Sequence, residues 1–273
     1  MKHRVAAIVL NLVLLVFSLV TITPFVWMLL SSFKTNPEIV AFDQTLWPQN
    51  PTGQNYVNVM AKFDFLRYFG NSLVYALAIT AISVYTSAAG GFVLGKYRFR
   101  GRQVLFAGIL STMMVPAIVT LIPRYSIMAA IGWIDTYASL IVPASFTAFG
   151  IFLMRQASAS IPDEMLEAAR IDGANEFRVF HQIALPQLRN SIVAIAIFQF
   201  LWAWDDYLWP YLMIRTGEKN LLSVALNLFS GRYTTDYAGL FAATSIAIIP
   251  VAVFYIVFQK QFIEGVAASA IKG

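Results

Sequence analysis

The feature that most constrains this chain is a series of apolar runs, each long enough to cross a lipid bilayer. A helix needs about 20 mostly apolar residues to span the hydrocarbon core. Six stretches of the 273-residue sequence meet this requirement: residues 5–30, 72–94, 104–122, 136–154, 191–213 and 239–258. Lipid offers the backbone no hydrogen-bond partners, and none of these runs shows the alternation of a barrel strand. The sequence therefore predicts an all-α integral membrane protein, a single transmembrane domain over residues 1–273 with six transmembrane helices.

The composition agrees with this class and argues against others. Only 12% of the residues are charged and 59% are hydrophobic, whereas soluble domains carry about 25% charged residues. The net charge of +5 is spread over the flanks of the apolar runs and forms no single patch, which argues against nucleic-acid binding. The basic residues before the first run resemble the start of a signal peptide. That run is too long, however, and has no small-residue cleavage site, so we expect a retained first helix.

The distribution of lysine and arginine predicts the orientation in the membrane. If the N-terminus is cytoplasmic, twelve of the 19 lysine and arginine residues fall in the cytoplasmic segments: 1–4, 95–103, 155–189 and 259–273. The short loop 96-KYRFRGR-102 carries four of them, and short loops count most in this rule. We therefore place both termini in the cytoplasm, with the chain crossing the membrane several times.

Two of the segments then expected on the outer side of the membrane are long. Residues 31–71 contain Asn-Pro, Trp-Pro and Asn-Pro-Thr-Gly turn signals. We interpret this segment as an extracytoplasmic cap with one or two short helices, including one over residues 54–70. Residues 215–237 form the second outer segment, which is a candidate contact for an extracytoplasmic partner.

A charged segment, residues 161–189, lies on the predicted cytoplasmic side between two apolar runs. Pro162 is typical of a first helical turn, and Gly173 divides the segment into two short amphipathic helices. In the second helix three apolar residues recur at a helical spacing: Phe177, Phe180 and Ile183. An exposed stripe of this kind is either a contact surface for a protein or the face of a helix lying on lipid headgroups. The spacing alone leaves both interpretations open.

The same segment resembles a known motif. Glu167-Ala168-Ala169, followed by Gly173, Ile183 and Leu185-Pro186, is similar to the EAA motif of ATP-binding-cassette importer permeases. The resemblance is to the carbohydrate-uptake branch, which includes the maltose permease G subunit. It extends over nearly the whole chain and includes further segments: 69-FGNSLVYA-76, 92-FVLGKYRFRG-101, 122-IPRYSIMAAIGWIDTYASLIVP-143 and 259-QKQFIEGVAASAIKG-273.

This resemblance implies a function and a set of partners. Permeases of this family carry a coupling helix that docks in a cleft on the ATPase subunit, so residues 161–189 are expected to couple this chain to ATP hydrolysis. ATP and Mg²⁺ would then bind to a partner ATPase dimer, and this chain would bind no cofactor. The implied assembly lies in the inner membrane of a bacterial or archaeal cell. It also contains a second permease subunit in the lipid bilayer and an extracytoplasmic solute-binding protein. The implied substrate is a sugar or sugar-like solute.

The resemblance also assigns roles to the motif residues. Glu167 is expected to form a charge-assisted hydrogen bond with the ATPase or to orient the motif, and Gly173 to permit a tight turn. The docking surface is expected to consist of Phe177, Phe180 and Ile183. The remaining motif residues complete the ATPase-coupling segment: Ala168, Ala169, Leu185 and Pro186.

Two acids lie within the fifth apolar run. Asp205 and Asp206 follow its start by about fifteen residues, which in a continuous helix places them roughly 22 Å from the cytoplasmic edge. A charged group in hydrocarbon is costly, so these acids are expected to face a wet pathway. There they would accept hydrogen bonds from sugar hydroxyls, while four aromatic residues would stack on sugar rings: Trp202, Trp204, Tyr207 and Trp209. The alternative is that they reach the outer interface and that the aromatic residues form an interfacial belt.

Other functional classes have weaker support. The stretch 90-GGFVLGKY-97 resembles a phosphate-binding P-loop, but Tyr97 replaces the serine or threonine that should bind Mg²⁺. With two histidines and no cysteine, no catalytic triad or metal cluster is apparent, so we expect a transport subunit and not an enzyme. The alternatives are a secondary transporter of a small polar solute, which the EAA spacing disfavours, and a permease for a non-sugar substrate.

Overall fold

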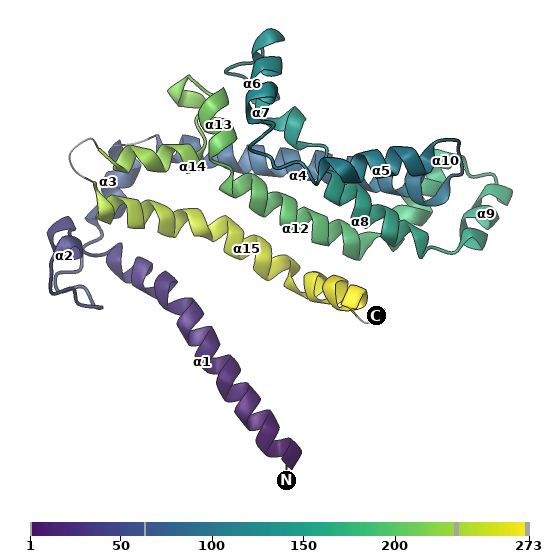
Figure 1. The fold of residues 1–273 in the computed structure, drawn as a ribbon. Coiled ribbons are helices and arrows are strands. Elements are labelled where there is room, and N and C mark those ends of the chain that lie inside the picture. The colour runs from purple at the N-terminus through teal and green to yellow at the C-terminus, as the bar shows by residue number, and fades with distance from the viewer. Residues whose placement is uncertain (1, 63, 232–234, 271–273) are drawn as a thin grey trace. The chain divides into compact units, whose positions relative to one another are not determined.

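The computed structural model describes residues 2–62, 64–231 and 235–270, and these residues are mostly helical (Figure 1). Four spans in this part of the chain are long and apolar enough to cross a membrane: Ala6–Ser31, Phe65–Lys96, Tyr137–Ala159 and Tyr237–Lys260. A fifth candidate is a bent pair, Glu176–Gln187 and Arg189–Asp205, whose two parts meet at 79°. The predicted helical membrane class is confirmed, with four to five apolar spans where the sequence predicted six continuous helices.

The chain divides into two compact units, which are described separately. The smaller unit comprises Met1–Leu66 and Ala225–Ile249, and the larger unit comprises Arg67–Val224 and Pro250–Gly273. The charged segment 161–189 and the two acids of the fifth apolar run both belong to the larger unit. The functional description below therefore rests on the larger unit alone.

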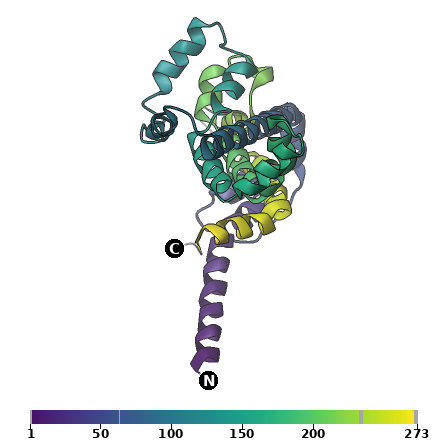
Figure 2. The same ribbon diagram turned by 90° about the vertical axis from the view of Figure 1, so that its right-hand side faces the viewer.

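Three helices of the larger unit lie side by side: α4 (Phe65–Lys96), α8 (Ala148–Ala159) and α12 (Arg189–Asp205) (Figures 1 and 2). Small residues let α4 and α8 approach closely, since a Cβ atom on Gly91 would lie only 2.3 Å from the Cβ of Met154. Between α8 and α12 the rings of Phe149 and Phe198 pack edge to face, with centroids 5.9 Å apart. Small residues at helix contacts are a common means of association in lipid, where the hydrophobic effect does not drive helices together.

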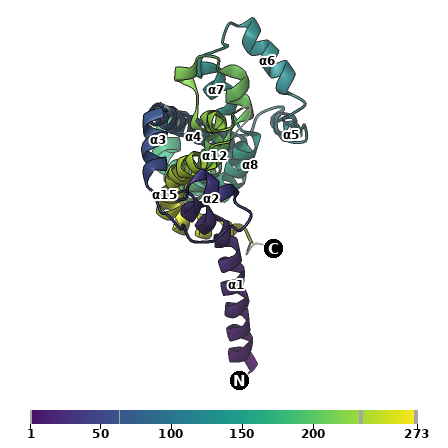
Figure 3. The ribbon, with the colours of Figure 1, turned by 90° about the vertical axis from the view of Figure 1, so that its left-hand side faces the viewer.

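The smaller unit contains the N-terminal helix and the segment predicted to form the cap. Its helices are α1 (Lys2–Ser31), α2 (Asn36–Val40), α3 (Gln54–Lys62) and the first part of α15 (Tyr237–Ala270) (Figures 1 and 3). The Asn36 side chain donates to the Asp236 carboxylate at 2.8 Å and accepts from the Ala238 amide at 2.9 Å. Two short helices, α2 and α3, are thus present, as expected. The helix predicted over residues 54–70 is interrupted, since α3 ends at Lys62 and α4 begins at Phe65.

The third predicted span, residues 104–122, is not a continuous helix. The chain forms α5 (Arg102–Thr112), then a series of turns, and then α6 (Leu121–Ala130), as Figure 3 shows. Pro116 explains the break, because it lacks an amide hydrogen and disfavours helical geometry in the residue before it. Its carbonyl accepts a turn hydrogen bond from the Val119 amide at 3.0 Å. Hydropathy thus located the apolar stretch but did not reveal its interruption.

The fifth predicted span, residues 191–213, is also interrupted. Helix α12 ends at Asp205, Asp206 adopts an extended backbone, and α13 (Leu208–Met213) follows. Pro210 explains this break, since in a continuous helix its ring would collide with the carbonyl of Asp206. That carbonyl instead accepts a hydrogen bond from the Ser223 hydroxyl at 2.7 Å. The two acids lie at a helix end, so the expectation of a continuous helix through them was wrong.

Candidate functional site

Residues 161–189, which we call the coupling loop, begin with helix α9 (Asp163–Ile171). Asp163 and Glu164 occupy its first turn, where acidic side chains complement the helix dipole. Pro162 immediately precedes the helix and has an extended backbone. The first helix of the segment is therefore formed as its sequence pattern predicts.

Helix α9 ends in a tight turn at Gly173, which has a φ of +85°. The Gly173 amide donates to the Arg170 carbonyl, and the Ala174 amide donates to the Ala169 carbonyl, both at 3.0 Å. These two bonds form a Schellman motif, whose central residue favours glycine because the left-handed conformation is strained for other residues. The turn expected at this glycine is therefore present.

The second part of the coupling loop changes its helical geometry twice. It consists of α10 (Glu176–Arg178), a π-helical turn over Val179–Ala184 and α11 (Leu185–Gln187). The side-chain oxygen of Asn175 caps its start by accepting from the Arg178 amide at 2.9 Å. After α11 the chain bends by 79° into α12. Isolated π-helical turns are rare and occur frequently at functional sites.

One apolar core joins the coupling loop to the helices of the larger unit. Leu166 of α9 and Phe180 of the π-helical turn are buried in the same cluster as Phe92 of α4 and Met154 of α8. The ring centroids of Phe180 and Phe92 lie 5.4 Å apart. The loop is therefore packed against the helix bundle and is not a separate segment.

The three apolar residues expected to share one docking stripe do not lie together. Phe177 is 67% exposed, whereas Phe180 is 8% exposed and Ile183 is partly buried against the core. The π-helical turn accounts for the difference, because residues three apart no longer share a face when the helix is widened. Ile171, which the sequence analysis did not single out, is 86% exposed. We call the exposed pair Ile171 and Phe177 the coupling surface.

The other motif residues divide between the surface and the core. Glu167, Ala168 and Pro186 are exposed, while Ala169 and Leu185 pack against the buried cluster. In the described part of the chain, no residue forms a hydrogen bond or ion pair with the Glu167 carboxylate. This carboxylate is thus available to another protein.

Polar contacts also fix the coupling loop to the end of α4. The Lys96 ammonium donates to the Asp163 carboxylate at 2.7 Å and also hydrogen-bonds to the Ile161 carbonyl. Lys96 lowers the pKa of Asp163, because it both hydrogen-bonds to the carboxylate and attracts its charge. The side chain of Lys96 is nearly buried, but that of Asp163 is 70% exposed, so water screens the pair and it positions the loop more than it stabilises the fold.

A second polar contact spans the turn at Gly173. Arg170 donates two hydrogen bonds to the Glu176 carboxylate, at 2.8 and 3.2 Å. The Tyr97 hydroxyl donates to the same carboxylate. Tyr97, which breaks the P-loop pattern in the sequence, therefore connects the loop after α4 to both halves of the coupling loop.

The larger unit also contains a cavity of about 670 Å³, a volume typical of small-molecule sites. Its polar and aromatic lining comes from several helices: Tyr75, Arg124, Gln199, Trp202, Asp206 and Trp209. The connection between α5 and α6 also lines it, through Met113, Ala117 and Ile118. Non-helical backbone at membrane depth is tolerated where it lines a water-filled cavity. The break in the third predicted span therefore coincides with this cavity.

The six residues predicted for the substrate pathway are only partly brought together. Asp206 lines the cavity, and its carboxylate accepts a hydrogen bond from the Tyr75 hydroxyl at 2.8 Å. Trp204 is buried elsewhere in the core. Asp205 and Tyr207 are exposed and do not line the cavity. Of the predicted set, three residues lie in the cavity wall: Trp202, Asp206 and Trp209.

The sequence analysis missed most of the cavity residues, including Tyr75 and Arg124. Tyr75 is one of several aromatic residues in an apolar run, and nothing in the sequence distinguishes it. Arg124 follows the third apolar run directly. A basic residue at the end of an apolar run was the one sequence signal that could have pointed to it. Its guanidinium carbon lies 4.3 Å from the ring centroid of Trp209. This position beside a distant tryptophan depends on tertiary packing that the sequence pattern does not reveal.

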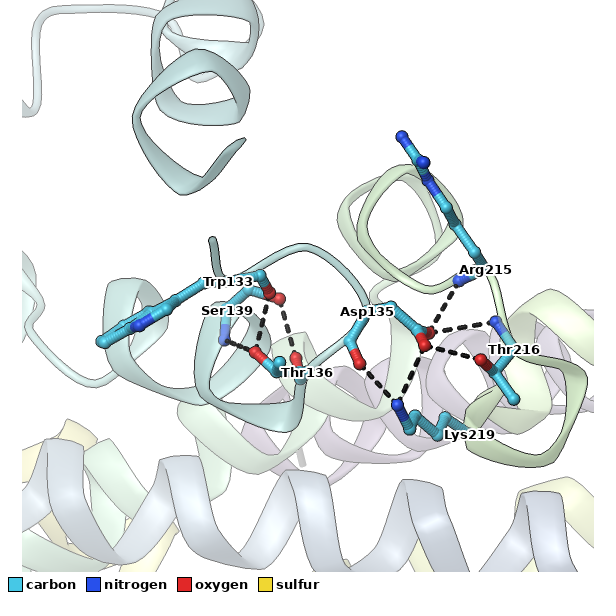
Figure 4. A network of polar contacts seen from close by, with 7 residues as sticks. All are labelled: Trp133, Asp135, Thr136, Ser139, Arg215, Thr216 and Lys219. Carbon is cyan, nitrogen blue, oxygen red and sulfur yellow. Dashed lines mark hydrogen bonds and ion pairs between the residues drawn. The ribbon is translucent and has the colours of Figure 1, made fainter. Parts of the chain in front are cut away.

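A polar network centred on Asp135 joins the segment before α7 (Tyr137–Ala144) to the segment after α13 (Figure 4). The Asp135 carboxylate accepts from the amides of Arg215 and Thr216, both at 3.0 Å, and from the Lys219 ammonium at 2.9 Å. The Thr216 hydroxyl donates to it at 2.5 Å. These bonds, those from Thr216 most strongly, hold the pKa of Asp135 well below its ordinary value of 3.8. The network fixes part of the second predicted outer segment.

We expect Asp135→Asn to lower the stability of the folded chain at neutral pH. Asparagine tolerates the φ of +61° at this position, so the substitution removes the charge without straining the backbone. A carboxyl with a lowered pKa stabilises the fold while it is ionised, and this contribution is lost as the pH falls below its ordinary pKa. The stability difference between the two proteins should be constant above about pH 5 and shrink below about pH 4.

Thermal unfolding of the purified proteins across this pH range measures the effect. Asp43→Asn is the matched control, because Asp43 is an exposed aspartate outside the network, and it should leave stability unchanged. The role assigned to the ionised carboxylate would be contradicted by one result: the stability difference between Asp135→Asn and the unsubstituted protein is equally large at pH 3 and pH 7.

Comparison with known proteins identifies the class to which this arrangement of apolar helices belongs. The family model described as the binding-protein-dependent transport system inner membrane component matches residues 87–267. This match covers more than half of the chain and includes the coupling loop. The chain belongs to this family and is a permease subunit of a binding-protein-dependent importer.

Individual relatives are similar over almost their full length. The chain is 31% identical to the arabinooligosaccharides transport system permease protein AraQ of Bacillus subtilis (strain 168), covering 100% of this chain and 98% of that protein. It is 28% identical to the lactose transport system permease protein LacG of Rhizobium radiobacter, covering 98% of each. Among solved structures, a chain of a bacterial ABC transporter involved in the import of the acidic polysaccharide alginate is 26% identical, with a TM-score of 0.84 and coverage of 96% and 98%.

Proposed function

We propose that this chain forms half of a translocation pathway and that its coupling loop transmits the movements of a separate ATPase dimer to its membrane helices. The observation that carries the proposal is the two-sided packing of the loop. Leu166 and Phe180 are buried in the core shared with α4 and α8, while Ile171 and Phe177 are exposed. A displacement of the exposed pair is therefore passed to the bundle. A rigid connection of this kind transmits movement without taking part in chemistry.

The contacts between the two halves of the loop support this rigid-body role. The pairing of Arg170 with Glu176, together with the hydrogen bond from Tyr97, restrains the loop on either side of Gly173. Glu167 would form a charge-assisted hydrogen bond with the ATPase. ATP and Mg²⁺ would bind to the ATPase, and this chain would supply movement and no catalytic group.

We further propose six membrane crossings. In this topology α5 and α6 with their connection form one interrupted crossing, and α12 with α13 forms another. The short basic loop 96–102 and the coupling loop would both face the cytoplasm, as would the two termini. Residues 31–71 would then form an extracytoplasmic cap, and this cap and the segment fixed by Asp135 would face the binding protein.

The substrate of the importer would be a sugar or sugar-like solute. The relatives AraQ and LacG, which are named for arabinooligosaccharides and lactose, support this substrate class. The description of the family as binding-protein-dependent supports a separate extracytoplasmic solute-binding protein. A second permease subunit in the same inner membrane would supply the other half of the pathway.

Two phenylalanine substitutions in the coupling loop separate docking from folding. Phe177→Asp should abolish retention of the ATPase subunit during purification, while the stability of the permease stays unchanged because Phe177 is largely exposed. Phe180→Ala should instead lower the stability of the permease by about 3–5 kcal/mol, since it leaves a cavity in a buried core. Co-purification with the tagged permease and thermal unfolding of the permease measure the two effects.

Phe42→Asp is the matched control for a surface phenylalanine, because Phe42 is fully exposed and lies outside the coupling loop. It should leave ATPase association intact. Undiminished association in the double variant Ile171→Asp, Phe177→Asp would overturn the assignment of the coupling surface.

A further inference from the structure

Arg124 is a cationic residue of the cavity wall, and its position is fixed by a buried partner. Its guanidinium lies over the face of Trp209. Trp209 is itself buried, and its indole nitrogen donates to the Ser139 carbonyl at 2.9 Å. Stacking occupies one face of the guanidinium and leaves the N–H groups at its edge able to donate to a ligand.

The charge of Arg124 is attracted by the Asp206 carboxylate at longer range but is not held in an ion pair. Among the described residues, no carboxylate lies within the 4.0 Å that defines an ion pair with its guanidinium. Asp206, on the wall of the same cavity, is hydrogen-bonded to Tyr75 and not to Arg124. An unpaired guanidinium in a largely apolar cavity is a strong site for a carboxylate or phosphate, to which it can donate two parallel hydrogen bonds.

The rest of the cavity suits a sugar ring. Asp206 is oriented by Tyr75, and its carboxylate has further lone pairs that can accept from ligand hydroxyls. Trp202 also lines the cavity and is 54% exposed, so its ring offers an apolar face for stacking. A ligand that reaches both Arg124 and Asp206 therefore needs hydroxyl groups at one end and an anionic group at the other.

We propose that this cavity binds an anionic saccharide, with Arg124 holding its carboxylate or phosphate and Asp206 accepting from its hydroxyl groups. This inference rests on the proposed function, because it names the substrate class of that pathway. A neutral sugar of the same size would leave the Arg124 charge without a partner, and the cavity would bind it less tightly. Arg124 is thus a specificity-determining residue of this chain, in addition to any selection by the binding protein.

The test is equilibrium binding to the complete importer in nanodiscs, without the binding protein, with three probes: digalacturonate, glucose 6-phosphate and cellobiose. We expect at least one anionic probe to bind about tenfold or more tightly than cellobiose, and Arg124→Gln to remove this preference without weakening cellobiose binding. Arg124→Lys should retain part of the preference, because it keeps the charge but loses the planar fork. The anionic probe that binds better distinguishes a carboxylate from a phosphate.

Arg215→Gln is the matched control, because this guanidinium donates to the Tyr125 hydroxyl at 3.1 Å and does not line the cavity. It should leave all three affinities unchanged. Three results would overturn the proposal. They are equal affinities for cellobiose and the anionic probes, no binding of either anionic probe, and an equal loss of affinity for all three probes in Arg124→Gln. ATPase association through Phe177 is measured without any saccharide probe. A failure of the present proposal therefore leaves the permease assignment unaffected, and the two failures can be distinguished.

Discussion

Substitution of Gly173 by proline is expected to abolish ATP-driven import. Proline fixes φ near −65° and has no amide hydrogen, whereas Gly173 has a φ of +85° and its amide donates to the Arg170 carbonyl. The substitution therefore removes the turn that sets α9 against the second half of the coupling loop. Uptake of the solute carried by the binding protein, and the ATP hydrolysis that this loaded protein stimulates, should both fall to background. Solute capture by the isolated binding protein should be unaffected.

Gly132→Pro is a closely matched control for this substitution. Gly132 also ends a helix with a positive φ, +72°, and its amide donates to the Ala129 carbonyl at 3.1 Å. The local backbone cost is thus similar, but Gly132 lies outside the coupling loop, so Gly132→Pro should retain coupled ATP hydrolysis. Gly173→Ala, which strains the turn by only about 1–2 kcal/mol, should reduce import less than proline does. Normal uptake in Gly173→Pro would contradict the coupling assignment.

Gly91→Ala is expected to destabilise the bundle strongly for a change of one methyl group. A Cβ atom at this position would lie 2.3 Å from the Cβ of Met154 and 2.6 Å from the backbone nitrogen of Arg155. Because one of these atoms is backbone, α4 and α8 must move apart to admit it. We expect a loss of about 3 kcal/mol, at the upper end of the usual cost of overpacking. Thermal unfolding and the yield of folded permease measure it.

Gly90→Ala provides the comparison for this substitution one residue away on the same helix. A Cβ at Gly90 would meet Ile151 at 3.5 Å, which is an ordinary contact. Alanine also favours a helix over glycine by about 1 kcal/mol, so this variant should be as stable as the unsubstituted protein or slightly more so. Equal stability of the two alanine variants would show that α4 and α8 do not approach as closely as described.

The sequence alone predicted the parts of this protein that depend on local patterns. Apolar length identified four of the spans, and the turn at Gly173 was expected because the residue interrupts an amphipathic pattern. Pro116 and Pro210 favour the two breaks. Proline alone does not predict them, however, because other prolines lie inside helices of the same chain: Pro24, Pro143 and Pro250. Hydropathy averages over such residues, and the continuous spans predicted there were therefore wrong.

The remaining differences depend on tertiary packing, which a pattern of residue types does not contain. Phe177 and Phe180 look equivalent in the sequence, and only contacts with residues such as Phe92 place one in the core and the other on the surface. Arg124 and Tyr75 line one cavity although they come from different helices. Long-range proximity of this kind required the structure.

The core that Leu166 and Phe180 share with the bundle has a consequence for how such permeases can change over time. The coupling loop is not a module that can be exchanged by itself, because its inner face must fit the side chains of α4 and α8. Its outer face has no such restriction within the chain. A permease could therefore acquire a different ATPase partner by substitutions at Ile171 and Phe177, while a transplanted loop would have to bring its matching membrane helices with it.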